Sequence, residues 1–151
     1  MSVRLNRLHA TWPLALLAIP LIAGCSSPPG ELLYPVAGRV TYAGKPLTTG
    51  SVTLVPDTVK GNKSDHRPTG TIGADGRYTI YSPVGRLGAP PGWYKVAVRA
   101  HEPALDTGGA HPGLPKYIIP QRYAGNETTP LAVEVLEKPA PGAYDLVLEA
   151  K

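Results

Sequence analysis

The stretch Trp93-Tyr94-Lys95-Val96-Ala97-Val98-Arg99-Ala100 is the longest run of the chain in which large apolar side chains alternate with polar or small ones. Successive side chains of a β-strand point to opposite faces, so one face of this run carries its bulky apolar residues. Those residues are Tyr94, Val96 and Val98. The alternation therefore predicts a long strand that buries one face.

Shorter runs of the same kind lie on both sides of this strand. They cover residues 36–42, 51–55, 68–73, 77–81, 131–136 and 143–148. Asp75-Gly76 between two of them is a hairpin signal, because glycine accepts the positive φ that a tight turn requires. In the last two runs we expect Leu131, Val133, Val135, Tyr144, Leu146 and Leu148 to point inward. About seven short strands without a convincing helix predict an all-β sandwich.

Composition agrees with strands joined by turns. The 151 residues include 17 Gly and 18 Pro, which disfavour helices, and no Phe, so other apolar residues and Tyr must fill the core. The formal net charge is +4, and the sequence contains no block of Lys or Arg. We therefore expect no nucleic-acid partner.

The N-terminus carries a different kind of signal. Arg4 and Arg7 precede an uncharged run from Trp12 to Ala23, and the only cysteine, Cys25, follows Ala23-Gly24. A basic start, an apolar run too short for a bilayer and small residues before a cut are typical of a secretory signal. With a cysteine at the cut, the signal resembles that of bacterial lipoproteins, whose thiol receives a diacylglycerol before the chain is cleaved in front of it.

We accordingly expect a cleaved signal peptide over residues 1–24, a lipidated tether over 25–34 and one domain over 35–151. The mature chain of 127 residues is long enough for a single core. It would be exported and held by the diacylglycerol on Cys25 on a membrane, which we expect to be the outer membrane, facing the periplasm or the cell surface. The alternatives are a plain signal with an incidental cysteine and an uncleaved anchor helix. Pro13 and Pro20 argue against the helix.

The order of several motifs resembles a known family. These motifs are Tyr34-Pro35-Val36-Ala37-Gly38-Arg39-Val40-Thr41-Tyr42 with Gly44-Lys45-Pro46-Leu47, then Asp75-Gly76-Arg77-Tyr78-Thr79-Ile80, then Gly92-Trp93-Tyr94-Lys95-Val96-Ala97-Val98, and finally Ile119 to Tyr123 with Leu131 to Val135. Residues 34–149 resemble the carboxypeptidase regulatory-like domains in small lipoproteins of planctomycete-type bacteria. The resemblance implies a transthyretin-like (prealbumin-like) β-sandwich of about seven strands, and brings no catalytic residues or cofactor.

Enzymes of related architecture need residues that this chain lacks. It ends Leu148-Glu149-Ala150-Lys151, without the Tyr-Arg-Gly-Ser terminus of 5-hydroxyisourate hydrolases. It has no His-x-His pair like that of intradiol dioxygenases, because His66, His101 and His111 are scattered. A metallocarboxypeptidase would need a separate catalytic domain. Asp65-His66-Arg67 could serve acid/base work, but no nucleophile accompanies them. We expect no enzyme.

A metal site is a second alternative. His101, Glu102, Asp106 and His111 are suitable ligand types within one stretch. Their spacing matches no established site, and Gly108-Gly109 between them favours a solvated loop. We therefore predict no metal and no cofactor.

Aromatic side chains suggest a carbohydrate-binding alternative, since sugars stack on exposed rings. The candidates are Trp93, Tyr117 and Tyr123, and Trp93 is expected near a sheet edge beside Pro90-Pro91. Packing in the core or at an edge is the competing interpretation for each ring. The preferred function is a non-catalytic interaction or structural module at the cell envelope, whose partner is an unidentified envelope protein or a glycan. Recognition would use residues 56–66 and 101–130, or a free edge strand.

Overall fold

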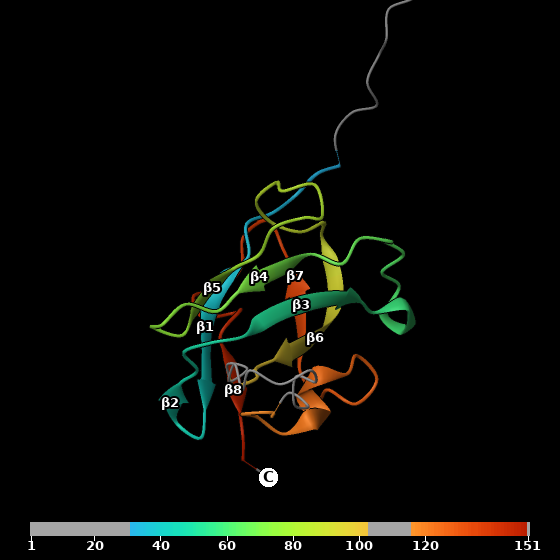
Figure 1. Ribbon diagram of the computed structural model, residues 1–151. Coiled ribbons are helices and arrows are strands. Elements are labelled where there is room, and N and C mark those ends of the chain that lie inside the picture. Colours follow the sequence, from blue (N-terminus) through green and yellow to red (C-terminus); the bar gives the residue numbers. More distant parts are fainter. Residues whose placement is uncertain (1–30, 103–115, 151) are drawn as a thin grey trace, which may run out of the picture. The chain divides into compact units, whose positions relative to one another are not determined.

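Two four-stranded sheets form the part of the chain that the computed structural model describes, residues 31–102 and 116–150 (Figure 1). One sheet contains β1 (Ala37–Tyr42), β2 (Lys45–Pro46), β5 (Arg77–Thr79) and β8 (Leu146–Leu148). The other contains β4 (Thr69–Thr71), β3 (Ser51–Pro56), β6 (Gly92–Arg99) and β7 (Ala132–Val135), in that order. Two short 3₁₀ helices, η1 (Thr58–Lys60) and η2 (Gln121–Ala124), lie in the connections.

The all-β sandwich expected from the sequence is confirmed. The described part has eight strands where about seven were expected, and the additional one is the two-residue β2. Lys45 and Pro46 lie outside the runs predicted as strands, but they pair with Tyr42 and Thr41 of β1. The turn itself is confined to Ala43 and Gly44, which both have positive φ.

The hairpin predicted at Asp75-Gly76 is also confirmed. Gly76 has a φ of +79°, and the N–H of Gly73 donates to the carbonyl of Arg77 at 2.8 Å. The two strands of this hairpin belong to different sheets, since β4 pairs with β3 and β5 pairs with β1. Isolated bridges Ile72–Tyr78 and Thr69–Tyr81 still join them. The hairpin therefore links the two layers along one side.

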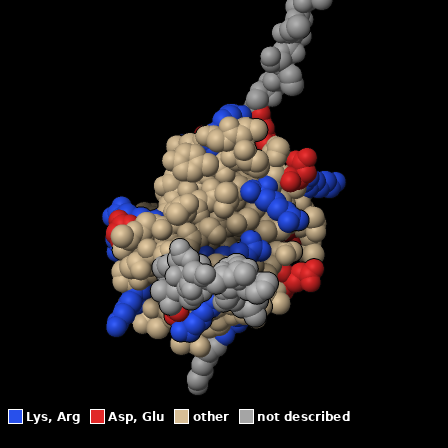
Figure 2. All heavy atoms as spheres, in the orientation of Figure 1, with Lys and Arg blue, Asp and Glu red and all other residues tan. Residues whose placement is uncertain are grey.

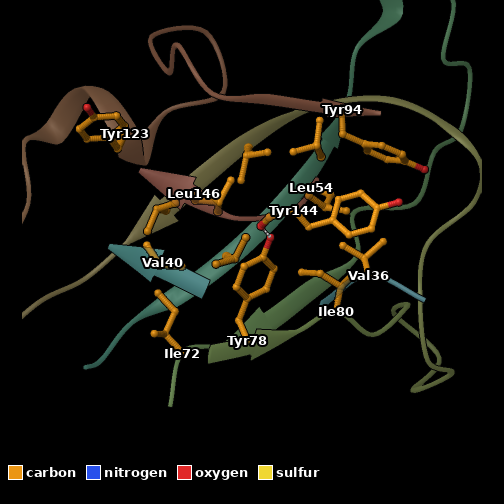
Figure 3. Close-up of a cluster of buried hydrophobic side chains, with 14 of the residues drawn as sticks. Val36, Val40, Leu54, Ile72, Tyr78, Ile80, Tyr94, Tyr123, Tyr144 and Leu146 are labelled. Atoms are coloured by element: carbon orange, nitrogen blue, oxygen red, sulfur yellow. Dashed lines mark hydrogen bonds between the residues drawn. The ribbon is translucent and has the colours of Figure 1, made fainter. Parts of the chain in front are cut away.

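Residues from both sheets share one apolar core (Figure 3). Tyr94, Val96 and Val98 of β6 are fully buried, as their alternation predicts. In the last two runs, the expected inward residues are likewise buried or half-buried: Leu131, Val133, Val135, Tyr144, Leu146 and Leu148. The face that β6 presents to the other sheet was thus correctly identified from the sequence.

Tyrosines occupy core positions that Phe would fill in many proteins, and each buried hydroxyl has a backbone partner. The hydroxyl of Tyr78 donates to the carbonyl of Tyr144 at 2.6 Å, which Figure 3 draws as a dashed line. Three other bonds are Tyr94 hydroxyl to Pro90 carbonyl at 2.9 Å, Glu149 N–H to Tyr123 hydroxyl at 2.9 Å, and Leu136 N–H to Tyr144 hydroxyl at 3.2 Å. Buried polar groups must be paired, so these bonds let tyrosine serve as a core residue.

The chain closes when β8 adds to β1 in parallel, with Leu146 opposite Val40 and Leu148 opposite Tyr42. Just before β8 the backbone of Tyr144 passes directly over Gly38. A Cβ atom at position 38 would lie well inside van der Waals contact with the carbonyl of Tyr144. The side chain of Asp145 accepts from the N–H of Arg39 at 2.8 Å and extends the pairing. Gly38 is therefore required for this close approach.

Gly38→Ala should lower the free energy of unfolding by about 3 kcal/mol, because the added methyl must displace backbone. The matched control is Gly73→Ala, whose Cβ would meet only a side-chain oxygen of Asp75 at 3.2 Å and an Arg77 carbonyl at 3.5 Å. The control should cost less than about 1 kcal/mol. Equilibrium urea denaturation measures both. Equal effects would contradict the close approach at residue 38.

Alkaline pH should destabilise the fold through Tyr78. Burial, with smaller contributions from Asp145 and Tyr144, raises the pKa of this phenol above its ordinary value. The native state therefore keeps the proton after the unfolded state has lost it. The resulting stability is complete below about pH 10 and is lost as pH rises further.

The urea midpoint should accordingly fall as the pH rises above about 10, and Tyr78→Phe should flatten that fall. The control is Tyr81→Phe, since the ring of Tyr81 is half exposed. The control should follow the wild type. Parallel curves for all three proteins would show that Tyr78 is not the group responsible.

Candidate functional site

The lipidation candidate Cys25 lies outside the described residues, as do all of residues 1–30. The end of the expected tether is described. Tyr34 exchanges two backbone hydrogen bonds with Ala89, at 2.9 and 3.0 Å, so the chain joins the sandwich at this residue. In residues 31–102 and 116–150, none of the helices has the length and apolar character needed to cross a membrane.

Trp93 is half-buried on the outer face of β6. The expectation of a sheet-edge position is wrong, because β6 lies between β3 and β7 and Trp93 pairs with Glu134. Its carbonyl accepts from the N–H of Asp57 at 3.0 Å and from the amide of Asn62 at 2.9 Å. The ammonium of Lys60 lies 3.5 Å from the centre of the indole ring. A cation of the protein itself thus occupies a face that a sugar would need.

The segment that positions Lys60 is ordered by its own side chains. Asp57 accepts from the N–H groups of Val59 and Lys60 at 3.1 and 3.3 Å and begins η1 as its N-cap. Gly61, with a φ of +85°, ends it. Asn62 is buried. Residues 56–66 were expected to serve recognition, but the first half of that segment packs on the end of β6.

Tyr123 belongs to the core. Its side chain is only 3% exposed, and its hydroxyl accepts from the N–H of Glu149 at 2.9 Å and from Arg122 at 3.1 Å. Arg122 also donates to the carbonyl of Glu149 at 3.0 Å. The ring fixes η2 against the end of β8, which leaves Tyr123 no face for a ligand.

Tyr117 is the one member of the aromatic trio with an open ring in a hollow. It is 43% exposed and lies 4.6 Å from the ring of His101, centre to centre. A hollow of about 490 Å³ is lined by Tyr117 and by polar side chains that include Arg99, Gln121, Arg122 and Thr128. Trp93 and Arg99 stand at opposite ends of β6, about 20 Å apart at the rise of a strand. The three aromatic candidates therefore do not form one platform.

A second shallow hollow was missed by the sequence analysis. It measures about 510 Å³ and lies over the β4–β5 hairpin, where threonines, Arg77 and the exposed ring of Tyr81 line it. Gly70 lines the bottom of this hollow and has no side chain to fill it. A Cβ at this position would collide with the carbonyl of Thr79. Small residues on a hairpin are an ordinary packing signal, so this hollow had no distinguishing sequence pattern.

The histidines do not assemble a reaction centre in the described structure. His66 Nε2 lies 3.2 Å from a carboxylate oxygen of Glu31, and Nδ1 lies 3.6 Å from Asp65. His101 and Glu102 are described, whereas Asp106 and His111 lie outside the described residues. Nδ1 of His101 is buried without a hydrogen-bond partner in the described part of the chain. Within that part, no cluster of three or more His, Cys, Asp or Glu residues could hold a metal ion.

Comparisons with known proteins do not extend this picture. No family model, no curated protein and no solved structure matches the chain. The function must therefore be argued from the sequence motifs and from the surfaces described above.

Proposed function

We propose that this protein is an exported lipoprotein whose domain is a non-catalytic interaction or structural module at the bacterial cell envelope. The observation that supports this proposal most directly is the position of Cys25, directly after Ala23-Gly24 at the end of a short uncharged run. Each buried methylene of an acyl chain contributes about 0.8 kcal/mol, so a diacylglycerol on this thiol holds a small domain on a bilayer. The signal peptide is residues 1–24.

The domain belongs, in this proposal, to the transthyretin-like class of carboxypeptidase regulatory-like domains. The motifs of the resemblance support it, because they fall on the β1–β2 hairpin, the β4–β5 hairpin and β6 of a two-sheet sandwich. The specific topology is the part of the proposal that goes beyond the observed β-sandwich.

A non-catalytic role agrees with what the buried polar groups do. Asp57 caps η1, and the hydroxyl of Thr129 donates to the carbonyl of Val96 at 2.7 Å. The amide of Asn62 donates to Trp93, and Ser82 accepts from the N–H of Arg86 at 3.1 Å. These groups complete the backbone hydrogen bonding of turns and strand ends, which is a structural task.

Two surfaces could take a protein partner. Among the described strands, β7 pairs only with β6, so its outer edge can accept a strand from another chain. The hollow beside η2 offers polar side chains held by ordered backbone. Both features suit recognition by a rigid module.

The hollow at Tyr117 favours one alternative, a polysaccharide-binding module. Its exposed ring can stack on a sugar, and Arg99, Gln121 and Arg122 place hydrogen-bond donors around it. Of the three rings named from the sequence, Trp93, Tyr117 and Tyr123, this alternative uses Tyr117.

Cys25→Ala should abolish lipid labelling and release the protein from the membrane fraction or leave an uncleaved precursor. Metabolic labelling with an alkyne fatty acid, followed by fractionation, measures both. Ser26→Ala is the matched control and should remain labelled. Unchanged labelling of the Cys25 variant would refute the lipoprotein assignment.

For the polysaccharide alternative, a glycan array should detect binding that Tyr117→Ala reduces about tenfold or more, as expected for the loss of a stacking ring of roughly 1.4 kcal/mol. Trp93→Ala should bind like the wild type, because Lys60 already covers that ring. A silent array would exclude this alternative for the glycans displayed. Loss of binding in the Trp93 variant alone would locate the site on β6.

A further inference from the structure

Exposed apolar side chains gather at the end of the domain where the described chain begins. Leu32, Tyr81, Val84 and Leu87 are 60%, 47%, 77% and 50% exposed. They lie on the first residues of the described chain and on the turn between β5 and β6. We call these four residues the apolar tip.

A bridge pair and a shared hollow place the segments that carry the tip beside one another. Tyr81 and Leu87 face each other as a bridge pair. The residues on either side of Leu32, Glu31 and Leu33, line one hollow of about 190 Å³ together with Val84. Figure 1 shows the yellow-green segment of this turn beside the blue start of the described chain. In Figure 2 a basic and an acidic side chain lie directly beside that start, and the surface next to them is largely neither acidic nor basic.

The turn that carries Val84 is held rigidly. The N–H of Gly85 donates to the carbonyl of Ser82 at 2.9 Å, and the N–H of Ser82 donates to the carbonyl of Arg86 at 2.8 Å. The Ser82 hydroxyl accepts from the N–H of Arg86, and Gly85 adopts a φ of +78°. Turn positions of this kind usually carry polar residues. Here a fixed backbone displays valine at its apex, which favours contact with an apolar medium.

The short length of chain between the tip and Cys25 indicates that this apolar medium is the bilayer. Glu31 lies six positions after Cys25, and a fully extended chain advances at most about 3.5 Å per position. A lipid on Cys25 would therefore keep Glu31 within about 20 Å of the bilayer surface. Leu32 and Val84 adjoin Glu31, so the tip is the part of the described surface that is tied closest to the membrane by the covalent chain.

We propose that the apolar tip rests on the lipid surface of the membrane that holds the anchor, with Leu32, Val84 and Leu87 entering the headgroup–acyl boundary and Tyr81 at the headgroup level. This inference rests on the proposed lipidation of Cys25. Tyrosine is common at that depth because its ring is apolar and its hydroxyl stays wet. The charges at the tip are mixed: Arg86 is exposed, and Glu31 lies beside His66. Apolar contact, rather than attraction to anionic lipid, therefore drives the docking.

The test uses the full, lipidated chain in phosphatidylcholine vesicles. In Val84→Cys the new thiol is the only free one, because the thiol of Cys25 is consumed by its lipid. An environment-sensitive fluorophore on residue 84 should shift to the blue in vesicles. Nitroxide-bearing lipids should quench it about threefold or more, as expected for a side chain at the acyl boundary.

Val147→Cys is the matched control. Val147 is 65% exposed on β8, which Figure 1 places away from the β5–β6 turn. A label there should show neither shift nor quenching. Equal quenching at the two sites, or none at residue 84, would overturn the docking. A blue shift at residue 84 without nitroxide quenching would also overturn it and would assign the tip to a second copy of the chain.

Flotation of the vesicles separates this inference from the proposed function. Protein that carries no diacylglycerol by mass spectrometry and does not float with vesicles would overturn both the anchor and the docking. Protein that floats while residue 84 stays in water would overturn the docking alone and leave the anchor in place.

Discussion

The fold depends on one buried hydrogen bond, from the hydroxyl of Tyr78 to the carbonyl of Tyr144. It joins the β4–β5 hairpin to the segment that leads into β8 and lies next to the close approach of Tyr144 to Gly38. Without Tyr78, the Tyr144 carbonyl would be left buried and unpaired, at a cost of about 1–3 kcal/mol. Because β8 is only three residues long, its few ladder bonds need this support. The last strand of the sandwich is thus held by a side chain from the middle of the chain.

The same constraint determines which tyrosines can serve function. A core without Phe uses tyrosine. Each buried hydroxyl then needs a hydrogen-bond partner among the backbone groups that are not used in strand pairing. Irregular segments supply such groups at Pro90, Leu136, Tyr144 and Glu149. Tyr123 satisfies this requirement by pinning the C-terminal end of the chain, which is why it cannot serve as a sugar platform. Tyr117 and Tyr81 keep exposed rings and are free for contacts outside the domain.

Local patterns predicted the local structure well, and long-range placement poorly. The alternation of β6 identified Tyr94, Val96 and Val98, and the Asp75-Gly76 turn appeared where expected, because both depend on neighbouring residues. The parallel pairing of β8 with β1 joins residues about 106 positions apart, and no periodicity encodes such a partner. The position of Lys60 over Trp93 depends on how η1 folds back on β6, so the sequence left open whether this indole packs within the protein or is free for a ligand. Of the three candidate rings Trp93, Tyr117 and Tyr123, the proposal accordingly keeps Tyr117.

The arrangement of surfaces within the domain gives the anchoring a directional consequence. The apolar tip lies at the end where the described chain begins, whereas η2 lies toward the other end in Figure 1. Residues of η2 line the hollow at Tyr117. If the tip rests on lipid, the hollow is held away from the bilayer. The close-packed core between the two sheets keeps the hollow and the tip at a fixed separation. A diacylglycerol on a flexible tether would by itself leave the domain free to rotate. A second, weak contact at Val84 and Leu87 removes much of that freedom, because a tethered contact acts at high effective concentration. Anchor and tip together would therefore turn a general binding surface into one that faces the space beyond the membrane.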